Sequence, residues 1–175
     1  ISNDRTDYNT LIPVVKKHFR AFDESLKEVT ADSGYCSEKN LLFLKEHGIE
    51  SYIKLQDHEK RKTRAYKEDI GKYYNMSYHV FEDEHYYICH DGRELRHIQT
   101  ERKKQNGYTQ TFEVYACADC SGCEHKARCL YKYNPEKDGE KNKLMKINEQ
   151  WEELKAASHA NIESEKGILN RQIRS

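Results

Sequence analysis

The sequence predicts an α/β fold in which a β-rich, cysteine-bearing segment interrupts alternating helices and strands. Three observations support this fold class. Helix-like and strand-like segments alternate over residues 1–55, strand-like segments and cysteines fill residues 56–140, and helical periodicity returns over residues 141–175. We therefore expect three segments with these boundaries.

The first segment should hold two helices and two short strands. Apolar residues recur at helical spacing over residues 7–22, and a short β-prone run ends near Asp32. Ser37 suits the N-cap of a second helix and Gly48 its end, after which residues 49–55 alternate as a strand does. This order predicts parallel strands joined by a crossover helix.

The second segment should form a β-meander or a pair of hairpins, because the turn sequences CHDG and QNG separate its strand-like runs. The third segment should be helical from Lys143 onward, with a break at Gly167 before a last short helix. Four apolar residues share one face of this expected helix: Leu144, Ile147, Trp151 and Leu154.

Composition limits the class of protein. The 175 residues, 36% hydrophobic and 34% charged, suit one well-packed domain or two small ones in a polar globular chain. No apolar run approaches the roughly 18 residues of a membrane span, and the first residues lack the features of a signal peptide. We therefore expect a cytoplasmic protein without a membrane partner. The chain starts without Met and ends without a helix stop signal, which indicates a piece of a longer protein.

Four cysteines stand in the run CADCSGCEHKARC with the spacing C-x2-C-x2-C-x5-C: Cys117, Cys120, Cys123 and Cys129. In a reducing cytoplasm this density favours a metal ion over disulfides, and we expect Zn²⁺. An iron–sulfur cluster fits less well because the last gap is too long and no proline follows, and unmetallated thiols are the third alternative. Cys89, in YICHDG, is a substitute candidate for one of the four ligands, whereas Cys36 stands apart as an expected free thiol.

Two stretches are rich in basic residues, although the formal net charge is zero. A net charge of zero removes the simplest electrostatic argument for nucleic-acid binding. A run of charged residues usually forms a solvent-exposed face without a binding function. The functional alternative is a path for DNA. Its candidate residues are Lys60, Arg61, Lys62 and Arg64 in residues 54–67, and Arg102, Lys103 and Lys104 in residues 93–104.

Asp32 closes a short strand and is followed at once by Gly34 and a helix start. A carboxylate at this place is either a solvated strand end or a ligand for a cation, since burial without a partner is costly. The segment ADSGYCS around Asp32, the cysteine run and the closing SEKGILNRQIRS follow one another in an order and spacing that resemble the C-terminal half of bacterial insertion-sequence DDE transposases. The resemblance covers nearly the whole chain.

The resemblance implies a partial ribonuclease H-like core, interrupted by a zinc-ribbon-like insertion and completed by residues 141–175. In that family two Asp and one Glu hold two Mg²⁺ or Mn²⁺ ions that activate water or a 3′-hydroxyl for attack on a DNA phosphodiester. Asp32 matches the family's second Asp. The implied partners are transposon-end DNA and either a second copy or the missing transposase segments, at the bacterial nucleoid.

The family's first Asp precedes the position of Ile1, and its Glu follows the closing RS, so the resemblance implies that these 175 residues are inactive alone. Glu163 and Glu165 are the alternatives for the missing Glu. Asp4 and Asp7 are alternatives for the missing Asp, although capping or turn formation suits them better.

A non-catalytic, zinc-stabilised nucleic-acid-binding module is the alternative function, because aromatic residues interleave the cysteines and basic strands. An enzyme should need Mg²⁺ and Asp32, whereas a binding module should need neither.

Overall fold

In the computed structural model, which describes residues 7–22, 26–105 and 107–173, the chain divides into two compact units. One unit combines Ile1–Glu59 with Gln150–Ser175, and the other spans Lys60–Glu149. Both contain helices and strands, so the chain has the mixed α/β character that the sequence predicts. Among the described residues, none of the helices combines the length and apolar character that crossing a membrane requires.

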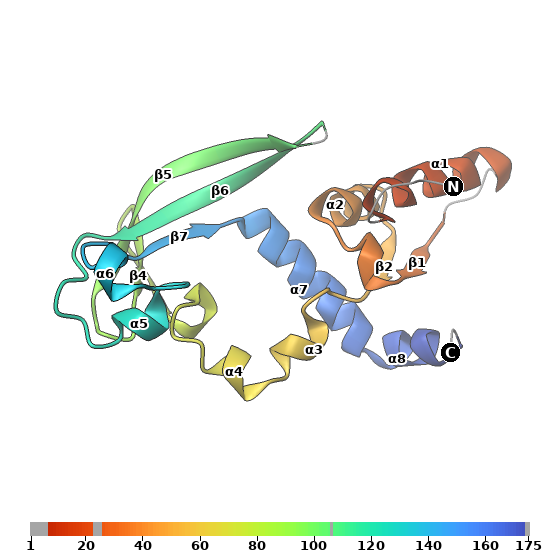
Figure 1. Cartoon of the computed structure of the whole chain (residues 1–175). Helices are drawn as coiled ribbons and strands as arrows, with labels where there is room; N and C mark the ends of the chain where they lie inside the picture. Colours follow the sequence, from red (N-terminus) through yellow and green to blue (C-terminus); the bar gives the residue numbers. More distant parts are fainter. Residues whose placement is uncertain (1–6, 23–25, 106, 174–175) are drawn as a thin grey trace. The chain divides into compact units, whose positions relative to one another are not determined.

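The split unit is built on a two-stranded parallel sheet (Figure 1). Its strands, β1 (Glu28–Ala31) and β2 (Glu50–Ile53), pair from Glu28↔Glu50 to Ala31↔Ile53. The helices of this unit are α1 (Leu11–Phe22), α2 (Glu38–Glu46), α7 (Glu149–Glu163) and α8 (Glu165–Ile173), with 3-10 turns η1 (Asp7–Asn9) and η2 (Ser33–Tyr35). The predicted order of helix, strand, helix and parallel strand is confirmed.

Helix α2 joins the two parallel strands and begins and ends where the sequence predicts. The side chain of Ser37 accepts a 3.3 Å hydrogen bond from the backbone N–H of Asn40, which satisfies one of the free donors at the helix start. After the helix, Gly48 adopts φ +66°, a conformation that favours glycine. Leu41 and Leu44 are almost fully buried in a core that also receives Leu154 of α7. The last part of the chain therefore completes the core that the first part begins.

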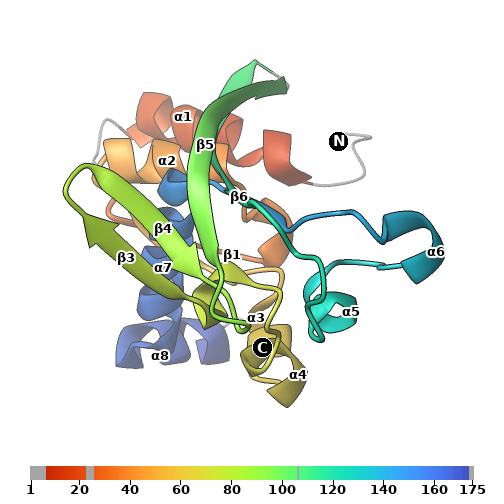
Figure 2. The same ribbon diagram turned by 90° about the vertical axis from the view of Figure 1, so that its left-hand side faces the viewer.

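The unit Lys60–Glu149 is built on a five-stranded antiparallel sheet in the order β3-β4-β5-β6-β7 (Figures 1 and 2). The strands are β3 (Ser77–Phe81), β4 (Glu84–Ile88), β5 (Glu94–Gln105), β6 (Tyr108–Cys117) and β7 (Leu144–Ile147). Short helical turns accompany them: α3 (His58–Arg61) at the junction of the units, α4 (Arg64–Lys67), η3 (Tyr73–Asn75), α5 (Lys126–Cys129) and α6 (Pro135–Asp138). The predicted meander is confirmed, and β7 adds a fifth strand.

Strands β5 and β6 extend beyond their neighbours as a two-stranded ribbon (Figure 1). On β5, β4 pairs only with residues 94–96, and on β6, β7 pairs only with residues 113–116. The pairing of β5 with β6 shifts by one residue between His97 and Gln99, so Ile98 forms a bulge. Beneath the base of the ribbon, Leu95, Tyr115 and Met145 form a small core.

Two sequence-based expectations about the last segment are wrong. The helix expected from Lys143 starts only at Glu149, because Leu144–Ile147 pairs with β6 and its residues are alternately exposed and buried, the period of a strand. The expected break at Gly167 lies instead at Ser164, and Gly167 is inside α8. A Cβ atom at Gly167 would lie 2.2 Å from the carbonyl oxygen of Asn161. Glycine is therefore required here because α8 passes close to the end of α7.

Candidate functional site

Asp32 lies at the carboxyl end of the parallel strand pair. It follows β1 directly with an extended backbone (φ −74°, ψ 165°), and its carbonyl oxygen accepts a 3.0 Å hydrogen bond from the N–H of Tyr35. Its side chain is exposed. The carboxyl ends of parallel strands form the edge at which α/β sheets usually bind ligands. Asp32 therefore occupies a place suited to cation binding, in a turn that leaves its carboxylate accessible.

Next to β1, helix α8 runs in the same direction as the strand. Near the start of α8, Lys166 forms an ion pair with Glu28 at the start of β1. One helical turn later, Nδ2 of Asn170 lies 3.4 Å from Oγ1 of Thr30. The carboxyl end of α8 is therefore directed toward the sheet edge that carries Asp32. Glu165, which precedes Lys166, lies at the opposite end of β1, so its position does not suit the missing catalytic Glu.

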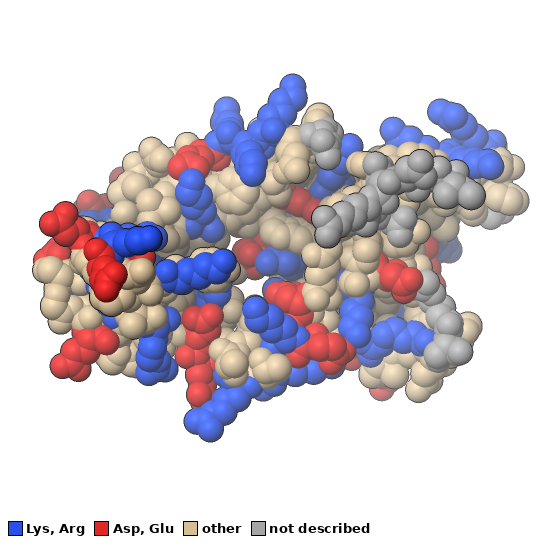
Figure 3. Space-filling model, in the orientation of Figure 1, with Lys and Arg blue, Asp and Glu red and all other residues tan. Residues whose placement is uncertain are grey.

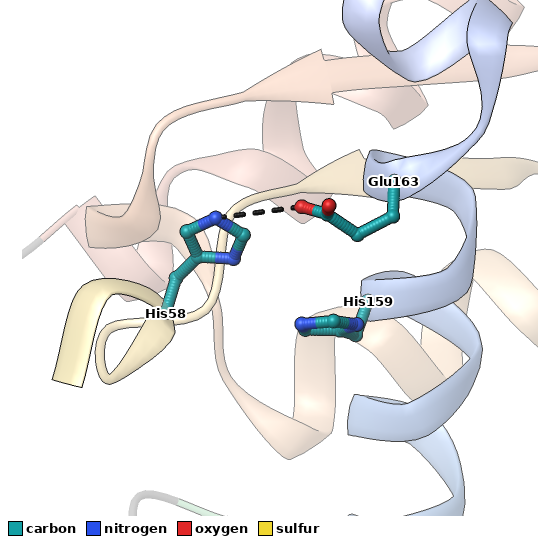
Figure 4. Close-up of side chains that lie close together, drawn as sticks. All are labelled: His58, His159 and Glu163. Atoms are coloured by element: carbon teal, nitrogen blue, oxygen red, sulfur yellow. Dashed lines mark ion pairs between the residues drawn. The ribbon is translucent and has the colours of Figure 1, made fainter. Parts of the chain in front are cut away.

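Glu163, the other alternative for that Glu, lies at the end of α7 beside His58 and His159 (Figure 4). Its Oε1 atom is 3.5 Å from Nε2 of His58 and 3.7 Å from the guanidinium of Arg171. One ligand atom from each of His58, His159 and Glu163 lies within 4.8 Å of the others. Of the alternatives for the missing Asp, Asp4 lies outside the described residues and Asp7 begins η1.

Five cysteines line one small cavity in the unit Lys60–Glu149: Cys89, Cys117, Cys120, Cys123 and Cys129. The cavity has a volume of about 20 Å³, which is room for a single ion or water molecule. Cys117 ends β6 and Cys120 follows three residues later, Cys129 ends α5, and Cys89 follows β4. Cys36, by contrast, is buried in the other unit, as its isolation in the sequence predicts.

The cysteine pocket is also lined by three basic side chains, those of Arg93, Lys126 and Lys143. The ammonium of Lys143 donates hydrogen bonds to the carbonyl oxygens of Gly71 (2.7 Å) and Cys129 (2.9 Å). Burial raises the pKa of the Cys117 thiol to about 11, with a smaller contribution from its hydrogen bond with Cys120. Burial also raises the pKa of Cys129. Without a metal these thiols are therefore protonated at neutral pH, and metal binding must displace their protons.

Taken three at a time, the sulfur atoms of the pocket are more widely spaced than a shared ion requires. No three of the described cysteines bring their sulfurs within 4.8 Å of one another, whereas the sulfurs of a tetrahedral zinc site are about 3.8 Å apart when Zn–S is about 2.3 Å. A metal ion in this pocket would therefore draw the sulfurs together.

The basic candidates lie at two separate places in the unit Lys60–Glu149. Arg102, Lys103 and Lys104 are exposed on the far half of the ribbon, where Figure 3 shows basic side chains projecting. Residues 60–64 run from the end of α3 to the start of α4, far from the end of the ribbon in both views (Figures 1 and 2). Here Arg64 forms a 2.8 Å ion pair with Glu68, and Arg61 is only half-exposed beside the ring of Tyr66. The two sets therefore do not form one continuous surface.

Comparison with known proteins identifies the family. A family model described as a transposase DDE domain matches residues 88–175, which is half of the chain. The chain belongs to this family. No curated protein and no solved structure matches it.

Membership of the transposase DDE domain family gives the site residues a context. Membership of this family implies a function related to transposition, DNA as the substrate and the use of divalent metal ions. The matched residues 88–175 include the five cysteines of the pocket and α8, whereas Asp32 precedes them.

Sequence reasoning missed the group formed by His58, His159 and Glu163. One signal was present in the sequence: His159 and Glu163 are four residues apart and thus share one face of α7. The position of His58 gave no such signal, because it approaches α7 only through the folded core.

Proposed function

We propose that the chain is the C-terminal part of the catalytic domain of a DDE transposase, and that Asp32 helps to hold the divalent ions that cleave and join DNA. Two-metal phosphoryl transfer requires carboxylates that converge from separate elements. Asp32 supplies one of them from the end of β1. Segments outside the 175 residues supply the other Asp and the Glu, so the chain alone does not cut DNA.

The direction of α8 is the observation that carries this proposal. Lys166 meets the start of β1 and Asn170 meets Thr30, so helix and strand advance together toward Asp32. Two strand residues span about 6.6 Å and four helical residues about 6 Å. A helix that continued beyond α8 would therefore reach the level of Asp32 about four residues after Asn170. In the resembling transposases, the Glu follows shortly after the RS sequence, so it lies on this helix a few residues beyond that level.

The decisive experiment restores the upstream strand and the downstream helix from the flanking DNA sequence and measures cleavage of the element's ends in Mg²⁺. The change Asp32→Asn should abolish cleavage in the restored protein, because Asn keeps the size of Asp but loses the charge that holds the ion. Asp83→Asn, in the turn between β3 and β4, is the matched control and should leave cleavage unchanged. Cleavage by the 175 residues alone, or by the restored Asp32→Asn variant with an unchanged melting temperature, would disprove the assignment.

We further propose that the unit Lys60–Glu149 is a zinc-stabilised insertion in a ribonuclease H-like core. Four thiolates around Zn²⁺ carry an excess of two negative charges, and the cations of Arg93, Lys126 and Lys143 beside them would offset that charge. The small core of this unit favours a structural role for the metal. Five cysteines line the pocket, but a structural zinc ion takes only four ligands. Cys89 is therefore an alternative to one of the four cysteines of the C-x2-C-x2-C-x5-C run.

A non-catalytic nucleic-acid-binding module is the second candidate function, and the exposed basic ribbon favours it. A two-stranded β-ribbon fits the major groove of B-DNA, and Arg102, Lys103 and Lys104 lie on the part of the ribbon that extends past its neighbours. This function would need neither Mg²⁺ nor Asp32. Binding that is unchanged by chelation of Mg²⁺ and by Asp32→Asn, with no cleavage by the restored protein, would favour it over the enzyme.

A further inference from the structure

His58, His159 and Glu163 bring three ligand-type side chains together within the split unit (Figure 4). His58 begins α3, shortly after the end of β2, whereas His159 and Glu163 lie one turn apart on α7. The hydroxyl of Ser158 donates a 2.8 Å hydrogen bond to the carbonyl oxygen of Ile53, which holds this part of α7 against the end of β2. The core therefore fixes the two sides of the group relative to each other.

The spacing of the group matches a metal site better than a simple ion pair. Nε2 of His58 lies 3.5 Å from Oε1 of Glu163. A charge-assisted hydrogen bond is about 2.7–2.9 Å long, so this contact is too long for a strong one. Two ligands of a tetrahedral zinc ion, each about 2.1 Å from the metal, are about 3.4 Å apart. The observed distance is therefore close to the edge of a zinc coordination tetrahedron.

The surroundings of the group also suit a cation. His58 is 2% exposed, and its ring centroid lies 5.5 Å from that of His159, so two protonated rings here would repel each other. Charged side chains near the group include Glu59, 3.8 Å from His58 and paired with Lys54 at 2.8 Å, and Arg171, 3.7 Å from Glu163. Lys54 thus offsets the charge of Glu59, and Arg171 contacts the same oxygen of Glu163 that lies 3.5 Å from His58.

We propose that His58, His159 and Glu163 bind one divalent transition-metal ion, Zn²⁺ or an ion of similar chemistry. Two imidazoles and one carboxylate are a donor set for zinc, cobalt or nickel, whereas Mg²⁺ prefers oxygen ligands alone. This site includes neither Asp32 nor any residue of the cysteine pocket, which belongs to the other unit. The ion clamps α7 to the connection after β2, with its fourth position open to water.

The test is Zn²⁺ binding by the full 175-residue chain, measured by equilibrium dialysis and by the ring ¹⁵N shifts of histidines in NMR spectra. The wild-type chain should bind one more equivalent of Zn²⁺ than His159→Gln, and the ring signals of His58 and His159 should shift together on addition of Zn²⁺. Glu163→Gln should weaken this binding at least about tenfold. Zn²⁺ should also raise the melting temperature of the wild-type chain more than that of His159→Gln.

His18→Gln is the matched control, because His18 lies on α1 beside Phe22 and outside the group. It should bind Zn²⁺ as the wild type does. The proposal is overturned by equal Zn²⁺ stoichiometry in the wild type and His159→Gln, or by Glu163→Gln with unchanged affinity. Ring shifts confined to other histidines would overturn it as well, and this readout does not depend on whether a variant loses stability.

Discussion

The hydroxyl of Ser158 on α7 donates a 2.8 Å hydrogen bond to the backbone carbonyl of Ile53 at the end of β2, and 105 positions of sequence separate the two residues. Both groups are buried. The bond joins the last part of the chain to the sheet formed by the first part. It is thus one of the contacts that hold the split unit together.

Replacing Ser158 by Ala should lower the free energy of unfolding by about 1–3 kcal/mol, because the buried carbonyl of Ile53 would lose its partner. Urea unfolding of the purified chain measures the change. Ser77→Ala, at an exposed position on β3, is the control and should change the value by less than about 0.5 kcal/mol. Equal effects of both changes would show that the Ser158 bond contributes no net stability.

The stability of the split unit should decrease in acid, in part through Glu50. Hydrogen bonds from Lys166 and then Tyr52 hold the pKa of Glu50 below its usual value of 4.5. A lowered folded-state pKa contributes stability above the unfolded-state pKa, and this contribution is lost as the pH falls through the lower, folded value. Lys166→Met should therefore lose less stability than the wild type between pH 7 and pH 3.

The measurement for Glu50 is the urea midpoint at both pH values in low salt, since salt screens exposed pairs. Lys17→Met on α1 serves as the control and should behave as the wild type. If Lys166→Met loses as much stability in acid as the wild type does, the Lys166–Glu50 contact has no part in the pH dependence.

Tyr115 should tolerate the loss of its hydroxyl. The residue is fully buried, and within the described part of the chain its hydroxyl has no hydrogen-bond partner. Tyr115→Phe should leave the free energy of unfolding unchanged or raise it by up to about 2 kcal/mol, because an unsatisfied buried hydroxyl is costly. Tyr131→Phe, at an 81% exposed ring, should have no effect. A clear loss of stability in Tyr115→Phe would show that the hydroxyl is hydrogen-bonded, for example to water.

Removal of metal from the cysteine pocket should destabilise the unit Lys60–Glu149. Loading with Co²⁺ gives thiolate-to-cobalt absorption only when cysteines are ligands, so the signal is specific for this pocket. Cys120→Ser should lose most of that absorption, and Cys36→Ser, whose thiol is buried in the other unit, should keep it. Cys89→Ser and the single serine variants of Cys117, Cys123 and Cys129 then show which four of the five cysteines are ligands. Full absorption in Cys120→Ser, or an unchanged melting temperature after chelation, would contradict a structural metal site.

DNA binding by the ribbon should depend steeply on salt. Each neutralised phosphate contributes about 0.9 to the slope of log affinity against log salt, so reversing the charges of Arg102, Lys103 and Lys104 should reduce the slope by about 2 to 3. The same reversal at Arg61, Lys62 and Arg64 tests the second basic place separately. Fluorescence anisotropy with a DNA duplex measures both. If the slope of log affinity against log salt is unchanged, the reversed residues form a solvated face and do not contact DNA.

Local signals made the helices and strands of the first 55 residues predictable. Ser37 and Gly48 delimit α2 through contacts with their immediate neighbours, so their effect can be read from a few residues. β7 was mistaken for helix because its spacing of apolar residues fits both periods. Its pairing with β6 decides between them, and that partner lies some thirty residues earlier.

The candidate sites were predictable to the extent that their residues are close in sequence. The C-x2-C-x2-C-x5-C run indicates a shared pocket by spacing alone, and the structure adds Cys89 through the sheet. His58 and His159 come from opposite ends of the split unit, so only the closed core brings them together. The position of α8 beside β1 has the same origin, because the pairs Lys166–Glu28 and Asn170–Thr30 join distant segments.

The bulge at Ile98 determines which side of the ribbon presents the positive charge. Because β5 gains one residue there, Arg102 and Lys104 pair with Thr111 and Thr109 and thus lie on the same face as Tyr115. If Ile98 instead paired regularly opposite Val114, the outer half of β5 would turn over and Lys103 would lie on that face. The bulge therefore sets the phase of the outer ribbon, and regular pairing of Ile98 would move the charges of Arg102 and Lys104 to the opposite face without altering any lysine or arginine.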